Sequence, residues 1–188
     1  MTEAPDATLV AKVLAGDIQV FGHLVERYQD QMLAYVIYMG FSETEALDVV
    51  QESLVRAFRH LKRCGDPNRF DGWLFKIVSN VSKTHATRAA RRRTEPLESY
   101  GSTIEATQVR PDEAAEASWA REQVRRALDS VPHDQREALV LMYLQDLSVS
   151  EICEVTGASA SAVKMRLKRG REALRQELEP LFEEVPEP

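Results

Sequence analysis

The sequence predicts an all-α protein made of two small helical domains joined by a flexible linker. Apolar residues recur every three or four positions over most of the chain, as in amphipathic helices, and no strand-like alternation is present. The 188 residues suffice for one or two compact domains. From Glu95 to Asp112 the chain carries two prolines and a glycine without an apolar period. We therefore expect domains over residues 1–94 and 113–188 and a flexible acidic linker over 95–112.

The first long helix is predicted by an apolar stripe from Ile18 to Met39, and the second by a stripe from Ala46 to Leu61. Ser42 and Glu45 have the spacing of a capping box at the start of the second helix. The segment 63–69 breaks the pattern, because it contains a glycine and a proline that disfavour helical geometry.

A third helix is expected to start near Asn68 and to extend beyond its own hydrophobic stripe. The stripe ends at Val81, whereas alanines and arginines keep the helix propensity high to about Arg93. Phe70 and Trp73 invite a base-stacking interpretation, but their helical spacing with the other apolar residues favours a place in the core. The basic end of this helix has no packing role, so it is a candidate contact surface.

Composition and charge exclude several classes of protein. With 44% hydrophobic and 29% charged residues the chain is an ordinary globular one, which excludes wholesale disorder. The longest apolar stretch, 32–41, is about half the roughly 20 residues that span a bilayer, and no signal sequence is present, so we expect a cytoplasmic protein. Cys64 and Cys153 form no CxxC motif and are expected to be reduced thiols. His60 and Cys64 are four apart, but two ligands make a weak metal site, and we expect neither metal nor cofactor.

The net charge of −6 is unevenly distributed. Residues 1–94 sum to +2, residues 95–146 to −6 and residues 147–188 to −2. Two windows, 72–94 and 155–171, contain several cations and no acid. A solvated helix face is the alternative for any charged run, but such faces usually mix both signs. The two windows therefore indicate two separate anion-binding surfaces.

Helical spacing resumes over residues 114–128 and 132–144, and residues 147–174 then have the pattern of a helix-turn-helix. Ser148 and Glu151 form a second capping box, and Gly157 supplies the turn. Cys153, four residues before that glycine, is expected to be a small core residue, and Val163 and Leu167 to face inward. Two helices that merely pack together would share these features, but they would not need the acid-free outer face, which favours DNA binding.

Four segments of the chain resemble the extracytoplasmic-function group of bacterial RNA polymerase sigma factors in the sigma-70 family. They are DVVQESLVRAFRHL (48–61), FDGWLFKIVSN (70–80), RAARRR (88–93) and the stretch from LDSVPHDQ to GREAL (128–174). Their order and spacing match over about nine tenths of the chain. The resemblance implies that residues 1–94 form sigma region 2, a helical bundle, and residues 113–188 form sigma region 4.

The resemblance also implies a role for individual residues. Core polymerase would be bound through the clamp of its largest subunit and the flap of its second-largest subunit. Four residues match the clamp-binding segment and share one polar helix face, for which a solvated face is the alternative: Asp48, Gln51, Glu52 and Arg56. Asp48 and Glu52 have no histidine or metal partner in the sequence pattern, so acid/base catalysis is not expected.

Promoter DNA would be bound at two surfaces. Residues that match the −10 surface, where the loop captures a flipped base, are Arg63, Asp66, Asn68, Arg69, Asn80, Lys83, Thr84, Arg88, Arg91 and Arg92. Residues that match or flank the −35 recognition helix are Ser159, Ser161, Lys164, Met165, Arg166, Lys168 and Arg169. Met165 departs from the small polar residue that is usual in the family.

The sequence hypothesis is an alternative sigma factor that binds core polymerase, directs promoter-specific initiation and catalyses nothing itself. An anti-sigma factor is a common partner in this family. The free protein is expected to bind promoter DNA poorly, because its linker and tail are acidic. Two other interpretations stay open: a stand-alone helix-turn-helix regulator, which would need a dimer interface, and an adaptor that binds only protein and has little salt sensitivity.

Overall fold

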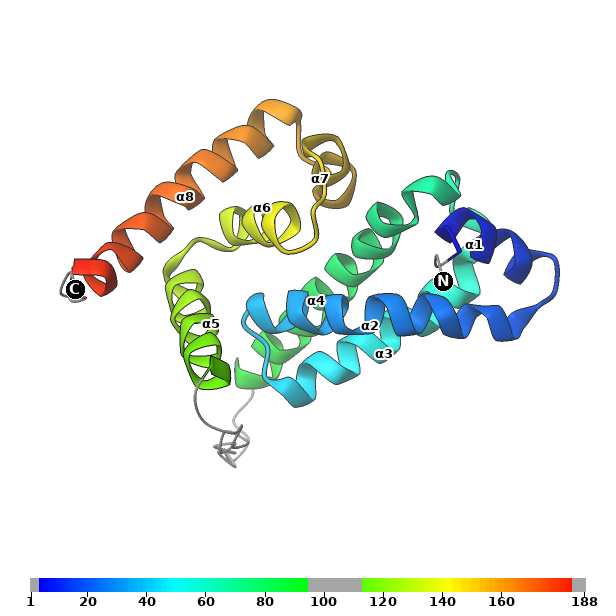
Figure 1. The fold of residues 1–188 in the computed structure, drawn as a ribbon, viewed down its shortest axis with the longest axis horizontal. Coiled ribbons are helices and arrows are strands. Elements are labelled where there is room, and N and C mark those ends of the chain that lie inside the picture. Colours follow the sequence, from blue (N-terminus) through cyan, green and yellow to red (C-terminus); the bar gives the residue numbers. More distant parts are fainter. Residues whose placement is uncertain (1–3, 95–112, 184–188) are drawn as a thin grey trace.

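The computed structural model describes residues 4–94 and 113–183, and its regular elements are all helical (Figure 1). The predicted all-α fold is confirmed. The first bundle comprises α1 (Asp6–Leu14), α2 (Phe21–Tyr38), α3 (Glu43–His60) and α4 (Phe70–Thr94), and the second comprises α5 (Glu113–Ser130), α6 (His133–Tyr143), α7 (Val149–Thr156) and α8 (Ala160–Glu183). The predicted linker, 95–112, lies outside the described residues. Among the described helices, none is long and apolar enough to cross a membrane.

The core of the first bundle lies where α3 packs against both α2 and α4. The predicted stripes supply much of it, and the fully buried side chains include Met32, Tyr35, Val36, Ala46, Val49, Ala57, Phe70, Leu74, Phe75 and Val78. The start of the first stripe was placed wrongly. Ile18 is 62% exposed and begins a short 3₁₀ turn (Ile18–Val20). The α-helix that follows begins at Phe21.

Sequence analysis missed the short helix α1. Leu9, Val10 and Val13 are buried against the first bundle, and their spacing is helical. Asp6, at the start of α1, accepts hydrogen bonds from Arg27 and from the hydroxyl of Tyr28, both on α2. These contacts hold α1 on the bundle, which explains why so short a helix is ordered.

The junction between α3 and α4 contains two 3₁₀ turns, Leu61–Arg63 and Pro67–Arg69. The Asp66 side chain accepts a hydrogen bond from the Asn68 backbone N–H at 3.0 Å and caps the second turn. As a result α4 begins at Phe70, two residues after the predicted start. The predicted overhang is confirmed, since Ser82 is the last buried residue of α4 among the side chains described up to Arg91.

The predicted helix-turn-helix is formed by α7 and α8. The Ser148 backbone N–H donates to Glu151 Oε2 at 2.8 Å, and the Glu151 N–H donates to Ser148 Oγ at 3.3 Å, which completes the capping box. Gly157 adopts the left-handed conformation with φ of 72°, which glycine allows without strain. Val163 and Leu167 are buried as predicted, whereas Cys153 is only half-buried at the edge of the core.

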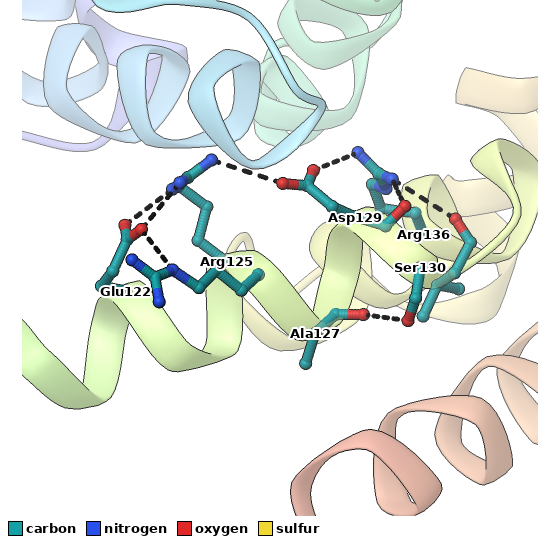
Figure 2. Close-up of polar contacts among 8 residues, drawn as sticks. Glu122, Arg125, Ala127, Asp129, Ser130 and Arg136 are labelled. Atoms are coloured by element: carbon teal, nitrogen blue, oxygen red, sulfur yellow. Dashed lines mark hydrogen bonds and ion pairs between the residues drawn. The ribbon is translucent and has the colours of Figure 1, made fainter.

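A corner of charged side chains joins α5 to α6 (Figure 2). Arg125 donates to both carboxylate oxygens of Glu122 at 2.8 Å and lies 3.4 Å from Asp129. Asp129 in turn accepts from Arg136 of α6 at 3.1 Å. The hydrogen bonds from Arg125, and then those from Arg126, lower the pKa of Glu122 from 4.5 to about 2.

The stability that Glu122 contributes is therefore expected to disappear at low pH. Because its pKa is lower in the folded than in the unfolded chain, its contribution is complete above pH 4.5 and is lost as the pH falls to about 2. The melting temperatures of the wild type and Glu122→Gln should thus differ most at about pH 7, and the difference should shrink steadily as the pH falls from 4.5 toward 2. In an Arg125→Ala background the difference at neutral pH should be smaller. A difference that does not change with pH would contradict this assignment.

The two bundles pack against each other. α4 lies along α7, and α2 touches α6, so that the buried residues form one continuous cluster across both bundles. Figure 1 shows α8 running away from this junction, with the two chain ends on opposite sides of the molecule. Gly72 of α4 lies at this junction, and a Cβ atom there would be 3.5 Å from the Glu151 side chain of α7.

Candidate nucleic-acid interface

The exposed end of α4 carries an open hollow with a volume of about 450 Å³. Five of the residues predicted for DNA contact line it together with Thr87: Asn80, Lys83, Thr84, Arg88 and Arg91. Thr87 was not predicted from the sequence, although it lies three residues after Thr84 on the same helix face. Because both threonine hydroxyls donate to helix carbonyls at 2.8 Å, their oxygens face outward as acceptors beside the cations. The hollow thus combines hydrogen-bonding groups with positive charge, which suits the backbone of a single nucleic-acid strand.

The predicted residues of the loop before α4 differ in exposure and in their contacts. Arg63, Asp66 and Asn68 are exposed, and the Asn68 side chain donates to Asp66 at 3.1 Å. Arg69 instead reaches the second bundle, where it donates to Glu154 at 2.8 Å and lies 3.6 Å from Glu151. Both carboxylates come from α7, so this contact depends on how the two bundles pack and was not predicted. The side chain of Arg92 lies outside the described part of the chain.

Cys64 lies inside this loop with its thiol 3.6 Å from the Asp66 carbonyl oxygen. Burial raises the pKa of Cys64, so the sulfur is held as a thiol. Among the described residues no group of three or more His, Cys, Asp and Glu side chains is arranged to hold a metal. Cys64 is 7% exposed and belongs to the cluster of buried residues.

Phe70 and Trp73 belong to the core, as predicted. Phe70 is 1% exposed, and its ring centroid lies 5.5 Å from that of Tyr28 and 5.7 Å from that of Trp73. Trp73 is half-buried and packs against the core. The position of Phe70 excludes it as a surface for stacking bases.

The polar face of α3 is built around an ion pair. Asp48 and Gln51 are exposed, whereas Glu52 pairs with Arg56 and lies 2.8 Å from Nε2 of His85 on α4. The hydrogen bonds from His85 and Arg56 lower the pKa of Glu52, so this carboxylate stays ionised. His85 was missed by sequence analysis, because only the packing of α3 on α4 brings it to this face.

Two exposed apolar side chains lie on this polar face. Leu47 and Val55 of α3 are 54% and 44% exposed, and their spacing places them in line with Gln51. Large apolar side chains next to charged ones are typical of surfaces that bind another protein. The face that matched a polymerase-binding segment therefore has both the charge and the apolar area of such a surface.

The outer face of α8 presents most of the residues predicted for duplex recognition. Exposed side chains are those of Ser159, Ser161, Lys164, Met165, Lys168 and Arg169. Arg166 differs from them, since it is half-buried with Nε 3.0 Å from Asp134 of α6. Gly170, one turn further along, lets α8 cross α6 closely, because a Cβ atom there would lie 2.9 Å from Leu139. The buried side of α8 thus fixes the direction in which its basic side points.

Two family models match this chain, one on each bundle. Sigma-70 region 2 matches residues 24–92, and sigma-70, region 4, matches residues 121–174. The RNA polymerase sigma-H factor of Pseudomonas aeruginosa is 30% identical over 195 residues, which cover 98% of this chain and all of that protein. The ECF RNA polymerase sigma-E factor of Escherichia coli (strain K12) is 31% identical over 186 residues, covering 94% of this chain and 96% of that one.

Solved structures agree with the fold. CnrH in complex with the cytosolic domain of CnrY has a TM-score of 0.67 and 27% identity, and the match covers 94% of this chain and 99% of CnrH. The sigma factor RpoE from Bartonella quintana, in complex with the anti-sigma factor NepR, has a TM-score of 0.65 and 21% identity, covering 85% and 96% of the two chains. The second likeness concerns the fold alone.

Proposed function

This chain belongs to the extracytoplasmic-function group of the RNA polymerase sigma-70 family, and from that premise we propose which residues carry its function. It is an alternative sigma factor that binds core RNA polymerase and directs promoter-specific initiation. The first bundle reads the −10 element and the second the −35 element. We assign region 2 to residues 1–94 and region 4 to residues 113–188, joined by a flexible acidic linker over 95–112.

The −10 element is read by the hollow on α4 and the adjoining loop. Lys83, Arg88 and Arg91 provide a positive track for the phosphates of the separated strand, and Asn80 and Thr84 provide hydrogen bonds to bases. Unstacking a base costs a few kcal/mol, and capture of that base beside the loop offsets this cost. The observation that supports this assignment most directly is the convergence of five predicted residues in one hollow.

The −35 element is read as duplex DNA by α8. Ser159, just before α8, and Ser161, in its first turn, are suited to contact base edges, and the exposed cations Lys164, Lys168 and Arg169 lie beside them for phosphates and bases. Arg92 completes the −10 set by its place in the basic run RAARRR. Arg166 supports α8 through Asp134 in addition to any contact with DNA.

Core polymerase is bound through the α3 face, where Asp48, Gln51, Glu52 and Arg56 contact the clamp, while region 4 contacts the flap. The protein acts in the cytoplasm as a non-enzymatic factor that needs no cofactor. CnrH was solved in complex with the cytosolic domain of CnrY, and this likeness supports a further protein partner for the present chain, for which the family resemblance suggests an anti-sigma factor.

Transcription in vitro with core polymerase and a promoter library tests the proposal. Asp48→Arg is the sharper variant, because Asp48 is exposed, whereas reversing Glu52 would also break its contacts with Arg56 and His85. Specific transcripts should require the protein, and Asp48→Arg should reduce them roughly tenfold or more by weakening polymerase binding. Asp30→Arg, the same reversal at an exposed site of α2, should leave them near the wild-type level.

Other outcomes would favour the other hypotheses. If nothing is transcribed while the protein alone selects duplex sites, it is a stand-alone regulator. If it selects no DNA at all, it is an adaptor that binds only protein. If Asp48→Arg behaves like Asp30→Arg, the assignment of the α3 face is wrong.

A further inference from the structure

A histidine of α4 completes the polar face of α3. Nε2 of His85 lies 2.8 Å from Oε2 of Glu52, and Arg56 donates a hydrogen bond to Oε1 of the same carboxylate. Because an ionised carboxylate only accepts hydrogen bonds, Nε2 carries the proton of the first contact. Both oxygens of Glu52 are therefore held, one by a residue of its own helix and the other by a residue of the neighbouring helix.

The two partners of Glu52 restrain it in different ways. Arg56 lies four residues further along α3, so it moves together with Glu52. His85 is 33 positions away in the sequence and belongs to α4, which packs against α3. His85 therefore fixes the carboxylate relative to the rest of the bundle, which a partner on the same helix cannot do.

This contact is not needed to hold the two helices together. Val49 and Ala57 of α3 and Val81 of α4 are completely buried in the hydrophobic core. The side chains of Glu52 and His85, by contrast, are 31% and 23% exposed. Partly exposed ion pairs contribute little to folding stability, because water solvates the separated groups well. We therefore expect a role for this pair other than stabilising the fold.

Restraint of a side chain favours its binding to a partner. A free glutamate side chain is flexible, and fixing it in an interface costs conformational entropy. In this protein the carboxylate of Glu52 is already ordered before a partner arrives. Each of its oxygens has a further lone pair beyond the one used by His85 or Arg56, so it can still accept hydrogen bonds from the partner. The other N–H groups of Arg56 can likewise donate to the partner.

From this geometry we propose that His85 is a positioning residue for polymerase binding, which acts by holding Glu52 in the orientation that the clamp receives. The proposal rests on the proposed function, because that function assigns the α3 face to core polymerase. Asp48 and Gln51 of the same face are exposed, so Glu52 is the member of the set that α4 orients. His85 itself acts through Glu52 and needs no contact with polymerase.

The test measures the affinity of the labelled full-length protein for core RNA polymerase by fluorescence anisotropy, at one ionic strength throughout. His85→Phe keeps an aromatic ring at this position and removes both nitrogens, whereas His85→Gln keeps an N–H donor of similar reach. Because a hydrogen bond to a charged group is lost, His85→Phe should bind polymerase about fivefold more weakly than the wild type. His85→Gln should stay within about twofold of the wild type.

A matched control and a double variant separate positioning from a structural role. His23→Phe makes the same substitution at an exposed contact on α2, where His23 lies 3.6 Å from Glu26, and it should bind polymerase like the wild type. In a Glu52→Ala background, His85→Phe should cause no further loss of affinity, because the carboxylate that His85 orients is gone. A structural role would instead lower the affinity by the same factor in both backgrounds.

Three results would overturn the positioning role. It is wrong if His85→Phe binds polymerase as tightly as the wild type, or if His85→Gln is as weak as His85→Phe. It is also wrong if His85→Phe loses its helical circular dichroism at the temperature of the assay, since the pair would then be holding the helices together.

Failure of the positioning role can be told apart from failure of the proposed function. If Asp48→Arg weakens polymerase binding and His85→Phe does not, the α3 face stays assigned to polymerase and only the role of His85 is overturned. If neither Asp48→Arg nor Glu52→Ala changes the affinity, the assignment of the α3 face is overturned as well. If the wild type does not bind core polymerase at all, the proposed function itself is wrong.

Discussion

Replacing Phe70 with alanine is expected to lower the free energy of unfolding by about 3–5 kcal/mol, the usual cost of removing a buried aromatic ring. Phe70 is 1% exposed at the first position of α4, with the rings of Tyr28 and Trp73 around it. Small domains have total stabilities of about 5–15 kcal/mol, so the variant should be close to unfolding. Urea denaturation followed by circular dichroism measures the difference.

Phe58→Ala is the matched control. Its ring is 40% exposed and makes one edge-on contact with Phe21 at 5.1 Å, so the expected loss is only about 1 kcal/mol. Equal losses for the two variants would show that the core is not organised around Phe70. A loss below about 1 kcal/mol for Phe70→Ala would contradict its complete burial.

Removing two exposed cations of the recognition helix should have the largest effect on DNA binding. The double variant Lys164→Ala/Arg169→Ala is expected to weaken promoter binding by the polymerase holoenzyme roughly a hundredfold, because each lost contact costs about 1–3 kcal/mol. Where a side chain pairs with a phosphate, the slope of log affinity against log salt should also become shallower by about one. Binding measured at several salt concentrations, with the −35 element intact and scrambled, gives both quantities.

Arg166→Ala tests whether Arg166 of the same helix has a structural role and not mainly a contact with DNA. Its guanidinium is half-buried against Asp134, so its loss should change the stability of the second bundle more than its affinity for the −35 element. The prediction fails if Arg166→Ala weakens promoter binding as much as the double variant does. The prediction for the double variant fails if that variant keeps the wild-type affinity for the promoter.

Features that depend on neighbours along the chain were predictable from sequence. The capping boxes of α3 and α7, the turn at Gly157 and the overhanging end of α4 were all expected and are confirmed. Each rests on hydrogen bonds or periodicity within a few residues, so the amino-acid order contains the necessary information. The misplaced start at Ile18 and the missed helix α1 share a cause, since contacts with each other and with α2 decide how such short segments fold.

By itself, then, the sequence determined the all-helical class and the two basic windows, because helical period and charge are local properties, whereas the residues proposed to meet DNA came from the family resemblance. Only the tertiary structure decided which of those residues are engaged elsewhere. It brings His85 to Glu52, Asp134 to Arg166 and Glu137 to Lys83 across separate helices. These pairings depend on how amphipathic faces pack at long sequence separation, and one sequence without its fold does not specify which charged side chains will meet.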